Sequence, residues 1–267
     1  MTMFSLKDKV AIVTGGASGI GEATIRRFAA AAARCVIADI DDASELAIEV
    51  GGDSRRCDVT DADVVNELVA DTVERYGRLD IMVNNAGVLG PGRGVLADDP
   101  GEGRAVIEVN LVGVVNGLRA AGAVMAPGSV IVNTASMAGV VGFPGIGWYG
   151  MAKWGVVGLT KHAAVELGPR GIRVNCVCPT GVDTPMAAAG ADDHWAVRSQ
   201  SLMNQHVERL ATADEVAAAI HYLATDEAMM VNGHSLAVDG GLAAGPSVQL
   251  IEAALGTAIG DKSGIFE

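Results

Sequence analysis

The chain has 267 residues, of which 50% are hydrophobic and 19% charged, and its formal net charge is −13 at pH 7. This length suffices for one large domain with its own core, and the composition excludes an intrinsically disordered chain. Because nucleic acids and anionic membrane surfaces bind basic faces, the negative charge argues against both kinds of partner.

Apolar strand-like segments alternate with helical segments along the chain. In chain order they are strand 9–15, helix 19–33, strand 34–40, helix 43–50, strand 54–60, helix 61–77, strand 79–87, helix 102–126, strand 128–136, helix 148–168, strand 171–179, helix 212–224 and strand 234–241. Strands that are apolar almost throughout and are separated by helices indicate a parallel sheet covered on both faces.

The predicted fold class is therefore α/β, with a single-domain, Rossmann-like, doubly wound parallel sheet flanked by helices. We expect the whole chain, 1–267, to form this one domain, with a core at about 7–242. Two regions are less regular. We expect residues 185–208 to cover the substrate and residues 243–267 to form a C-terminal extension.

The glycine-rich stretch TGGASGIG, residues 14–21, lies between the first strand and the first helix. Gly15 permits the turn, Gly19 lets the backbone approach a pyrophosphate, and Gly21 lets the helix pack closely on the sheet. The amides and the positive dipole end of the following helix favour an anion. Glycine spacing alone is a weak signal, but its place between a strand and a helix indicates dinucleotide binding.

Asp39 ends the second predicted strand, where an adenosine ribose would lie. A carboxylate there accepts hydrogen bonds from both ribose hydroxyls and repels a 2′-phosphate. Residues 40–44, IDDAS, add acid and no base, and Ser18 in the glycine turn is not basic either. The pattern predicts NAD rather than NADP, against the alternative that Asp39 is an ordinary turn residue.

Three polar side chains, Ser136, Tyr149 and Lys153, occupy a segment with few others. A free tyrosine is a poor base at neutral pH because its pKa is near 10. A lysine four residues later lies on the same helix face, and its ammonium favours the phenolate. Each residue alone also has a structural explanation: a strand-end hydroxyl, a packed ring or a surface lysine. Together they are best explained as an acid–base centre.

These motifs, in order, resemble the short-chain dehydrogenase/reductase family over about residues 7–242: the glycine turn, NNAG at 84–87, Asn110, Ser136, Tyr149 and Lys153. The resemblance implies a Rossmann-like domain with a nicotinamide cofactor. It makes Asn110, Ser136, Tyr149 and Lys153 the catalytic group, with Asn110 anchoring a water that links Lys153 to solvent.

The resemblance also implies a set of cofactor contacts. They are Gly15, Ser18, Gly19, Ile20, Gly21, Asp39, Ile40, Asp58, Val59, Asn85, Ala86, Gly87, Tyr149, Lys153, Pro179, Thr180, Gly181, Val182 and Thr184. Within this set, Asp58 and Val59 would lie near the adenine, and Val182 and Thr184 near the nicotinamide. The family usually has glycine after the proline at this place, so Thr180 departs from its pattern.

The substrate pocket is expected to be apolar, with no Arg or Lys placed for a carboxylate or phosphate. Its candidate residues are Met137, Val141, Phe143, Trp148, Met186 and Trp195. A hydrophobic secondary alcohol or ketone fits such a pocket: alicyclic, terpenoid or steroid-like. Residues 172–179 and 229–241 also resemble the branch with NAD-dependent alcohol dehydrogenases of terpenoid and lignan metabolism. The predicted function is an NAD-dependent oxidoreductase with Tyr149 as general base.

Two other functions remain open. One is an NADPH-dependent 3-oxoacyl-type ketone reductase, which would want a basic residue near position 16, 18 or 40, and none is present. The other is a non-catalytic dinucleotide-sensing protein. The intact set of Asn110, Ser136, Tyr149 and Lys153 argues against a sensor, because a sensor does not need Tyr149 to ionise.

Location and assembly follow from weaker signals. The N-terminus lacks a signal-peptide layout and the apolar runs are broken by Gly, Arg or Asp, so we expect neither secretion nor a membrane span. The cysteines, Cys35, Cys57, Cys176 and Cys178, are expected to be buried thiols in the cytoplasm. The five histidines show no metal-ligand spacing, so no metal is expected. The family resemblance implies a homotetramer.

Overall fold

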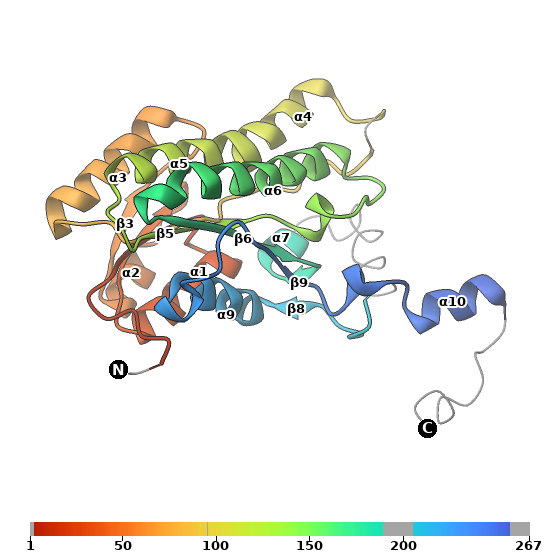
Figure 1. Ribbon diagram of the computed structural model, residues 1–267. Helices are drawn as coiled ribbons and strands as arrows, with labels where there is room; N and C mark the ends of the chain where they lie inside the picture. Colours follow the sequence, from red (N-terminus) through yellow and green to blue (C-terminus); the bar gives the residue numbers. More distant parts are fainter. Residues whose placement is uncertain (1–2, 95, 189–204, 257–267) are drawn as a thin grey trace.

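A computed structural model describes residues 3–94, 96–188 and 205–256 of the protein (Figure 1). Its centre is a seven-stranded parallel sheet of order β3-β2-β1-β4-β5-β6-β9. The strands are β1 Val10–Thr14, β2 Arg34–Asp39, β3 Asp53–Arg56, β4 Ile81–Asn84, β5 Val130–Thr134, β6 Arg173–Pro179 and β9 Ser235–Val238. A small second sheet pairs β7 Val182–Asp183 with β8 Ala211–Thr212.

Helices cover both faces of the seven-stranded sheet. One face carries α1 Gly19–Ala30, α2 Ser44–Val50 and α9 Ala213–Ala224, and the other carries α3 Ala62–Tyr76, α4 Pro100–Ile107, α5 Gly113–Val124 and α6 Gly147–Leu167 (Figure 1). Two further helices, α7 Pro185–Ala188 and α10 Val248–Leu255, lie outside these layers. The predicted α/β doubly wound class is confirmed.

The strands are apolar throughout because each is buried on both sides. In β1, Ala11 and Val13 pack into the core with α1, α2 and α9, whereas Ile12 packs into the core with α3, α5 and α6. This alternation follows the two-residue period of a strand. Phe28 of α1 is fully buried in the first core, which contributes roughly 2 kcal/mol.

The strand order reverses between β1 and β4, and this point positions the site. From β1 the chain winds outward through β2 to β3, and then returns to add β4 on the other side of β1. The loops after β1 and β4 therefore diverge to opposite faces of the sheet. In open parallel sheets, the crevice beyond the carboxyl ends of the strands at such a point is where ligands bind.

The helix expected at 102–126 differs from the structure in its bounds and in its continuity. It begins at Pro100 and is interrupted by a π-helical turn, Glu108–Val112, between α4 and α5. Single π turns inside helices often accompany functional sites, and this one contains Asn110. No sequence pattern predicted this π-helical turn. The side chain of Asn110 bonds the carbonyls of Val88 and Val106, and the bond to Val88 joins segments that are distant in the sequence.

The same helical run bears on the expectation that no segment could span a membrane. By length and composition alone, the 25 residues Pro100–Val124 would suffice, with a mean hydropathy of 1.2. Buried core helices pass the same test, and this helix packs against α3, α6 and β4. These contacts bury part of its apolar side chains, including Val106 and Val114.

Candidate active site

A cavity of about 500 Å³ opens at the carboxyl ends of the strands. Its wall contains almost every residue predicted to contact a cofactor or to carry the chemistry: Gly15, Ser18, Gly19, Ile20, Asp39, Ile40, Asp58, Val59, Asn85, Ala86, Gly87, Asn110, Ser136, Tyr149, Lys153, Pro179, Thr180, Gly181, Val182 and Thr184. Gly21 does not line the cavity. A Cβ there would lie 1.9 Å from the Gly15 carbonyl oxygen, so its place is set by helix packing.

The backbone of the glycine turn, residues 14–21, leaves little room for side chains at its glycines. Gly15 and Gly19 have φ values of +61° and +56°, which disfavour other residues. A Cβ on Gly15 would lie 2.8 Å from the Cα of Ala86, so the turn touches the loop after β4. Ser18 precedes α1 without a capping side-chain bond. The first amides of α1 therefore stay available to an anionic group, and a pyrophosphate fits there.

Asp39, the last residue of β2, lies beside the glycine turn. Its carboxylate accepts the Ala17 amide at 2.9 Å and the Asp41 amide at 3.1 Å, which fixes its orientation at the cavity wall. Asp41 and Asp58 lie in the same wall, and Lys153 is its one cation among the described residues. The residues that the structure describes include no cluster of three or more His, Cys, Asp or Glu that could ligate a metal.

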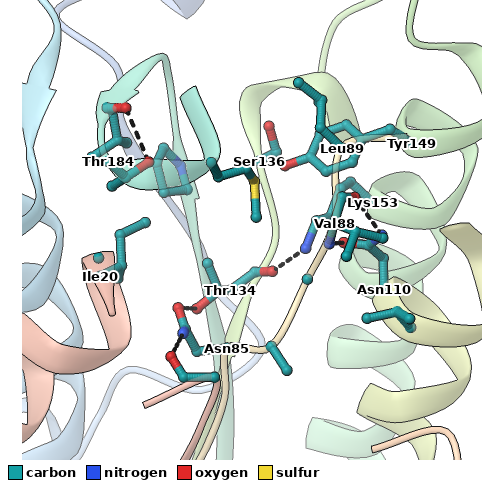
Figure 2. A pocket seen from close by; sticks show the side chains of 18 of the residues that line it. Ile20, Asn85, Val88, Leu89, Asn110, Thr134, Ser136, Tyr149, Lys153 and Thr184 are labelled. Carbon is teal, nitrogen blue, oxygen red and sulfur yellow. Dashed lines mark hydrogen bonds between the residues drawn. The ribbon is translucent and has the colours of Figure 1, made fainter. Parts of the chain in front are cut away.

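Three strand ends are tied together beneath the cavity. Asn85 donates from its side-chain amide to the carbonyls of Thr14 and Gly15, both at 3.1 Å, and its backbone amide donates to the Thr14 hydroxyl at 3.0 Å. The Thr134 hydroxyl donates to the Asn85 side-chain oxygen at 3.2 Å (Figure 2). These bonds fix β1, β4 and β5 relative to one another. The sequence-based site did not include Thr14 or Thr134.

Ser136, Tyr149 and Lys153 all line the cavity. Ser136 follows β5, and its hydroxyl accepts the Ala138 amide at 3.1 Å. The Ser136 hydroxyl and the Tyr149 phenol lie near each other in the site (Figure 2). Lys153, only 3% exposed, donates from Nζ to the Thr134 carbonyl at 2.8 Å. The same Nζ lies 5.5 Å from the centroid of the Tyr149 ring. The four-residue spacing on α6 brings the two side chains onto one face.

Burial sets the protonation of this pair in the protein alone. It lowers the pKa of the Lys153 ammonium to about 8, because the charged form loses its hydration. Burial also raises the pKa of Tyr149, and the Ser136 hydroxyl opposes this rise. In the protein alone, the phenol is therefore protonated at neutral pH.

Asn110 connects the π turn to the loop after β4. Its side-chain amide donates to the carbonyls of Val88 and Val106, at 2.8 and 2.9 Å, and its oxygen accepts the Val88 amide at 3.3 Å. A Cβ on Gly87 would lie 2.7 Å from that oxygen and 3.6 Å from Lys153 Nζ. Asn110 thus holds the loop close to Lys153. The water-anchoring role implied by the resemblance stays a prediction.

The apolar part of the wall agrees only in part with the residues expected there. Met137, Phe143 and Met186 line the cavity. Trp195 lies outside the described residues. The wall also contains apolar residues that sequence reasoning missed, because they come from separate loops with no shared pattern: Val88, Leu89, Ala138, Ile146, Ala187 and Leu210.

The structure does not bring Trp148 or Val141 to the cavity wall. The Trp148 indole lies against Gly103 of α4, where an added Cβ would come within 2.3 Å of the ring. Successive helix residues point about 100° apart, so Trp148 cannot share the direction of Tyr149. Val141 packs instead against the core that contains Met137 and Cys178.

Comparison with known proteins decides the family. A family model, adh_short_C2, described as Enoyl-(Acyl carrier protein) reductase, matches residues 15–243. Over 244 residues the chain is 44% identical to borneol dehydrogenase, mitochondrial, of Lavandula x intermedia, covering 89% of this chain and 91% of that protein. The chain belongs to the short-chain dehydrogenase/reductase family.

Other similarities agree with this membership. Trans-4-hydroxycyclohexanecarboxylate dehydrogenase of Sinomonas cyclohexanicum is 38% identical over 257 residues, covering 91% of this chain and 95% of that protein. The crystal structure of levodione reductase superposes with a TM-score of 0.83 at 33% identity, covering 89% of this chain and 98% of the other. As a short-chain dehydrogenase/reductase, the protein is an oxidoreductase that uses a nicotinamide dinucleotide.

Replacing the buried lysine tests the electrostatic description of this short-chain dehydrogenase/reductase site. Below pH 8, folding keeps a charge on Lys153 in an environment that disfavours it, so Lys153→Met is expected to raise the free energy of unfolding by roughly 1–3 kcal/mol. The lysine loses its proton near pH 8 when folded and near 10.5 when unfolded, so the gain should fade between these pH values. Denaturant unfolding of both proteins from pH 7 to 10.5 measures it.

A decrease in stability at pH 7, or a gain that does not change above pH 8, would contradict this description. Lys161→Met on the exposed face of the same helix is the matched control.

Proposed function

We propose that the protein is an NAD-dependent dehydrogenase that oxidises hydrophobic cyclic secondary alcohols, with Tyr149 as the general base. The observation that carries the proposal is the group of Ser136, Tyr149 and the buried Lys153, in one cavity with the carboxylate of Asp39.

The residues around the cavity fit NAD. The glycine turn and the start of α1 would hold the pyrophosphate, Asp58 and Val59 would contact the adenine, and residues 179–184 would contact the nicotinamide. The fixed carboxylate of Asp39 suits two ribose hydroxyls and repels a 2′-phosphate. When bound, NAD supplies the ring carbon that takes the hydride from the alcohol carbon.

The protein's own residues orient the alcohol and accept its hydroxyl proton. Ser136 hydrogen-bonds the substrate oxygen and directs it toward the Tyr149 phenol, and the phenolate form of Tyr149 takes the alcohol proton. The Lys153 ammonium stabilises that phenolate, and the Thr134 carbonyl keeps the ammonium in place. In the reverse direction, Tyr149 returns the proton to the ketone oxygen.

Two observations support a cyclic hydrophobic substrate. The wall near Tyr149 is apolar, with Met137, Phe143, Ile146 and Met186, and its described residues offer a bound carboxylate no cation besides Lys153. The names of two relatives give borneol and trans-4-hydroxycyclohexanecarboxylate as their substrates. For this chain we favour an uncharged alicyclic or terpenoid alcohol.

Assembly and location are also proposals. We propose a homotetramer with contacts through the long helices, supported by the half-exposed side chains of Met151 and Trp154 on α6. A cytoplasmic location is supported by the four cysteines, which are free and buried. The description of the matching family model favours the alternative of an acyl-thioester reductase, but the cavity wall, as far as the structure describes it, contains no basic residue besides Lys153 that could bind the 2′-phosphate of NADPH.

Cofactor choice is tested at Asp39. The unchanged protein should bind NADH at least about tenfold more tightly than NADPH, and Asp39→Asn should narrow this ratio roughly tenfold, because it removes the charge and keeps the shape. Fluorescence titration with both nucleotides measures the ratio. Asp42→Asn removes a nearby charge outside the cavity wall and is the control. Tighter binding of NADPH by the unchanged protein would support the reductase instead.

The general base is tested by Tyr149→Phe. We expect kcat for a cyclic secondary alcohol to fall by about 10³-fold, because the phenolate that takes the proton is lost, while the Kd for NADH changes little. Tyr222→Phe, at a distant position on α9, is the matched control. Turnover that survives Tyr149→Phe would refute the mechanism. NADH binding with no turnover of any alcohol or ketone by the unchanged protein would favour the sensor.

A further inference from the structure

Thr180 is held from two directions at the edge of the cavity. Its backbone amide donates to the Val238 carbonyl at 3.1 Å, which extends the pairing of β6 with β9. Its hydroxyl donates to the side-chain oxygen of Gln205 at 3.1 Å. Thr180 is not among the residues with positive φ. Glycine is therefore not required for the backbone path here, and the threonine contributes a side-chain bond that glycine could not make.

Gln205 makes that bond specific. The residue is 1% exposed, and its side-chain NH₂ donates to the Val207 carbonyl at 2.7 Å and to the Arg209 carbonyl. Because both of these partners accept only, the amide orientation is fixed and its oxygen needs a donor. The Thr180 hydroxyl is that donor. Without the hydroxyl, a buried amide oxygen would lose its partner, which is costly.

The turn organised by Gln205 supports the same side of the cavity. The amides of His206 and Val207 donate to the Gly240 carbonyl at 2.8 and 3.1 Å, which ties the turn to the segment after β9. The Ala211 amide donates to the Gly181 carbonyl at 3.0 Å, at the start of the β7–β8 pair. Leu210, between these bonds, lines the cavity.

We propose that Thr180 and Gln205 are positioning residues whose hydrogen bond holds residues 179–184 and Leu210 in the shape that receives the nicotinamide end of the cofactor. This inference rests on the proposed function, because it takes this wall as the nicotinamide side. Neither residue carries out a chemical step.

The test compares two ligands that share the adenosine end. NADH contains the nicotinamide and ADP-ribose lacks it. A change in the wall formed by residues 179–184 and Leu210 should therefore weaken the binding of NADH and not that of ADP-ribose. Thr180→Val removes the hydroxyl and keeps the shape, Thr180→Ser keeps the hydroxyl, and Gln205→Met removes the acceptor at similar length. Fluorescence gives the Kd for NADH and calorimetry gives the Kd for ADP-ribose. Thermal unfolding without ligand shows whether each variant is folded.

We expect Thr180→Val to raise the Kd for NADH about five- to twentyfold, with little change for ADP-ribose, and Thr180→Ser to restore most of the affinity. In the Gln205→Met background, the further change to valine should have little effect, because the bond is already lost. A merely structural role would lower the unfolding temperature and leave the ratio of the two Kd values unchanged.

The inference is overturned if Thr180→Val leaves NADH binding unchanged, if it weakens both ligands equally, or if its effect is the same with and without Gln205. If only the inference is wrong, the unchanged protein still binds NADH tightly. If the unchanged protein binds no NADH, the proposed function fails and takes the inference with it.

Discussion

The site depends on one unfavourable feature, the burial of the Lys153 ammonium beneath the cavity. Burial alone disfavours this charge and lowers its pKa to about 8. The Thr134 carbonyl and the face of the Tyr149 ring compensate part of the cost. A charge held in this way acts strongly on its neighbours, because little water screens it. One such neighbour is the Tyr149 side chain, whose ring centroid lies 5.5 Å from the Lys153 Nζ.

The parallel sheet makes this arrangement possible. All of its strands end at one edge, so the residues after β1, β4 and β5 meet there without long loops. Asn85 and Thr134 fix these ends by side-chain bonds, and Thr134 also supplies the carbonyl that Lys153 needs. The same few residues thus maintain the fold at its crevice and set the position of Lys153 beside Tyr149.

Local sequence patterns predicted the strands of the sheet and the pairing of Tyr149 with Lys153. The strands were recognisable because burial on both faces makes them apolar throughout, and Tyr149 and Lys153 because four residues return a helix to the same face. Long-range packing could not be seen in the same way. The π turn at Asn110, the rotation of Trp148 onto Gly103 and the bond between Thr180 and Gln205 each join segments that lie far apart in the sequence.

We expect Lys153, together with the positive charge of the oxidised nicotinamide, to make Tyr149 an anion near neutral pH. The chain has only three tyrosines, so ultraviolet difference titration of the NAD complex against Tyr149→Phe can isolate this phenol. With NAD bound, the pKa of Tyr149 should lie clearly below the value of about 10 for a free tyrosine, and it should be higher in Lys153→Met. A pKa of about 10 or more with NAD bound, or the same value without the lysine, would contradict it.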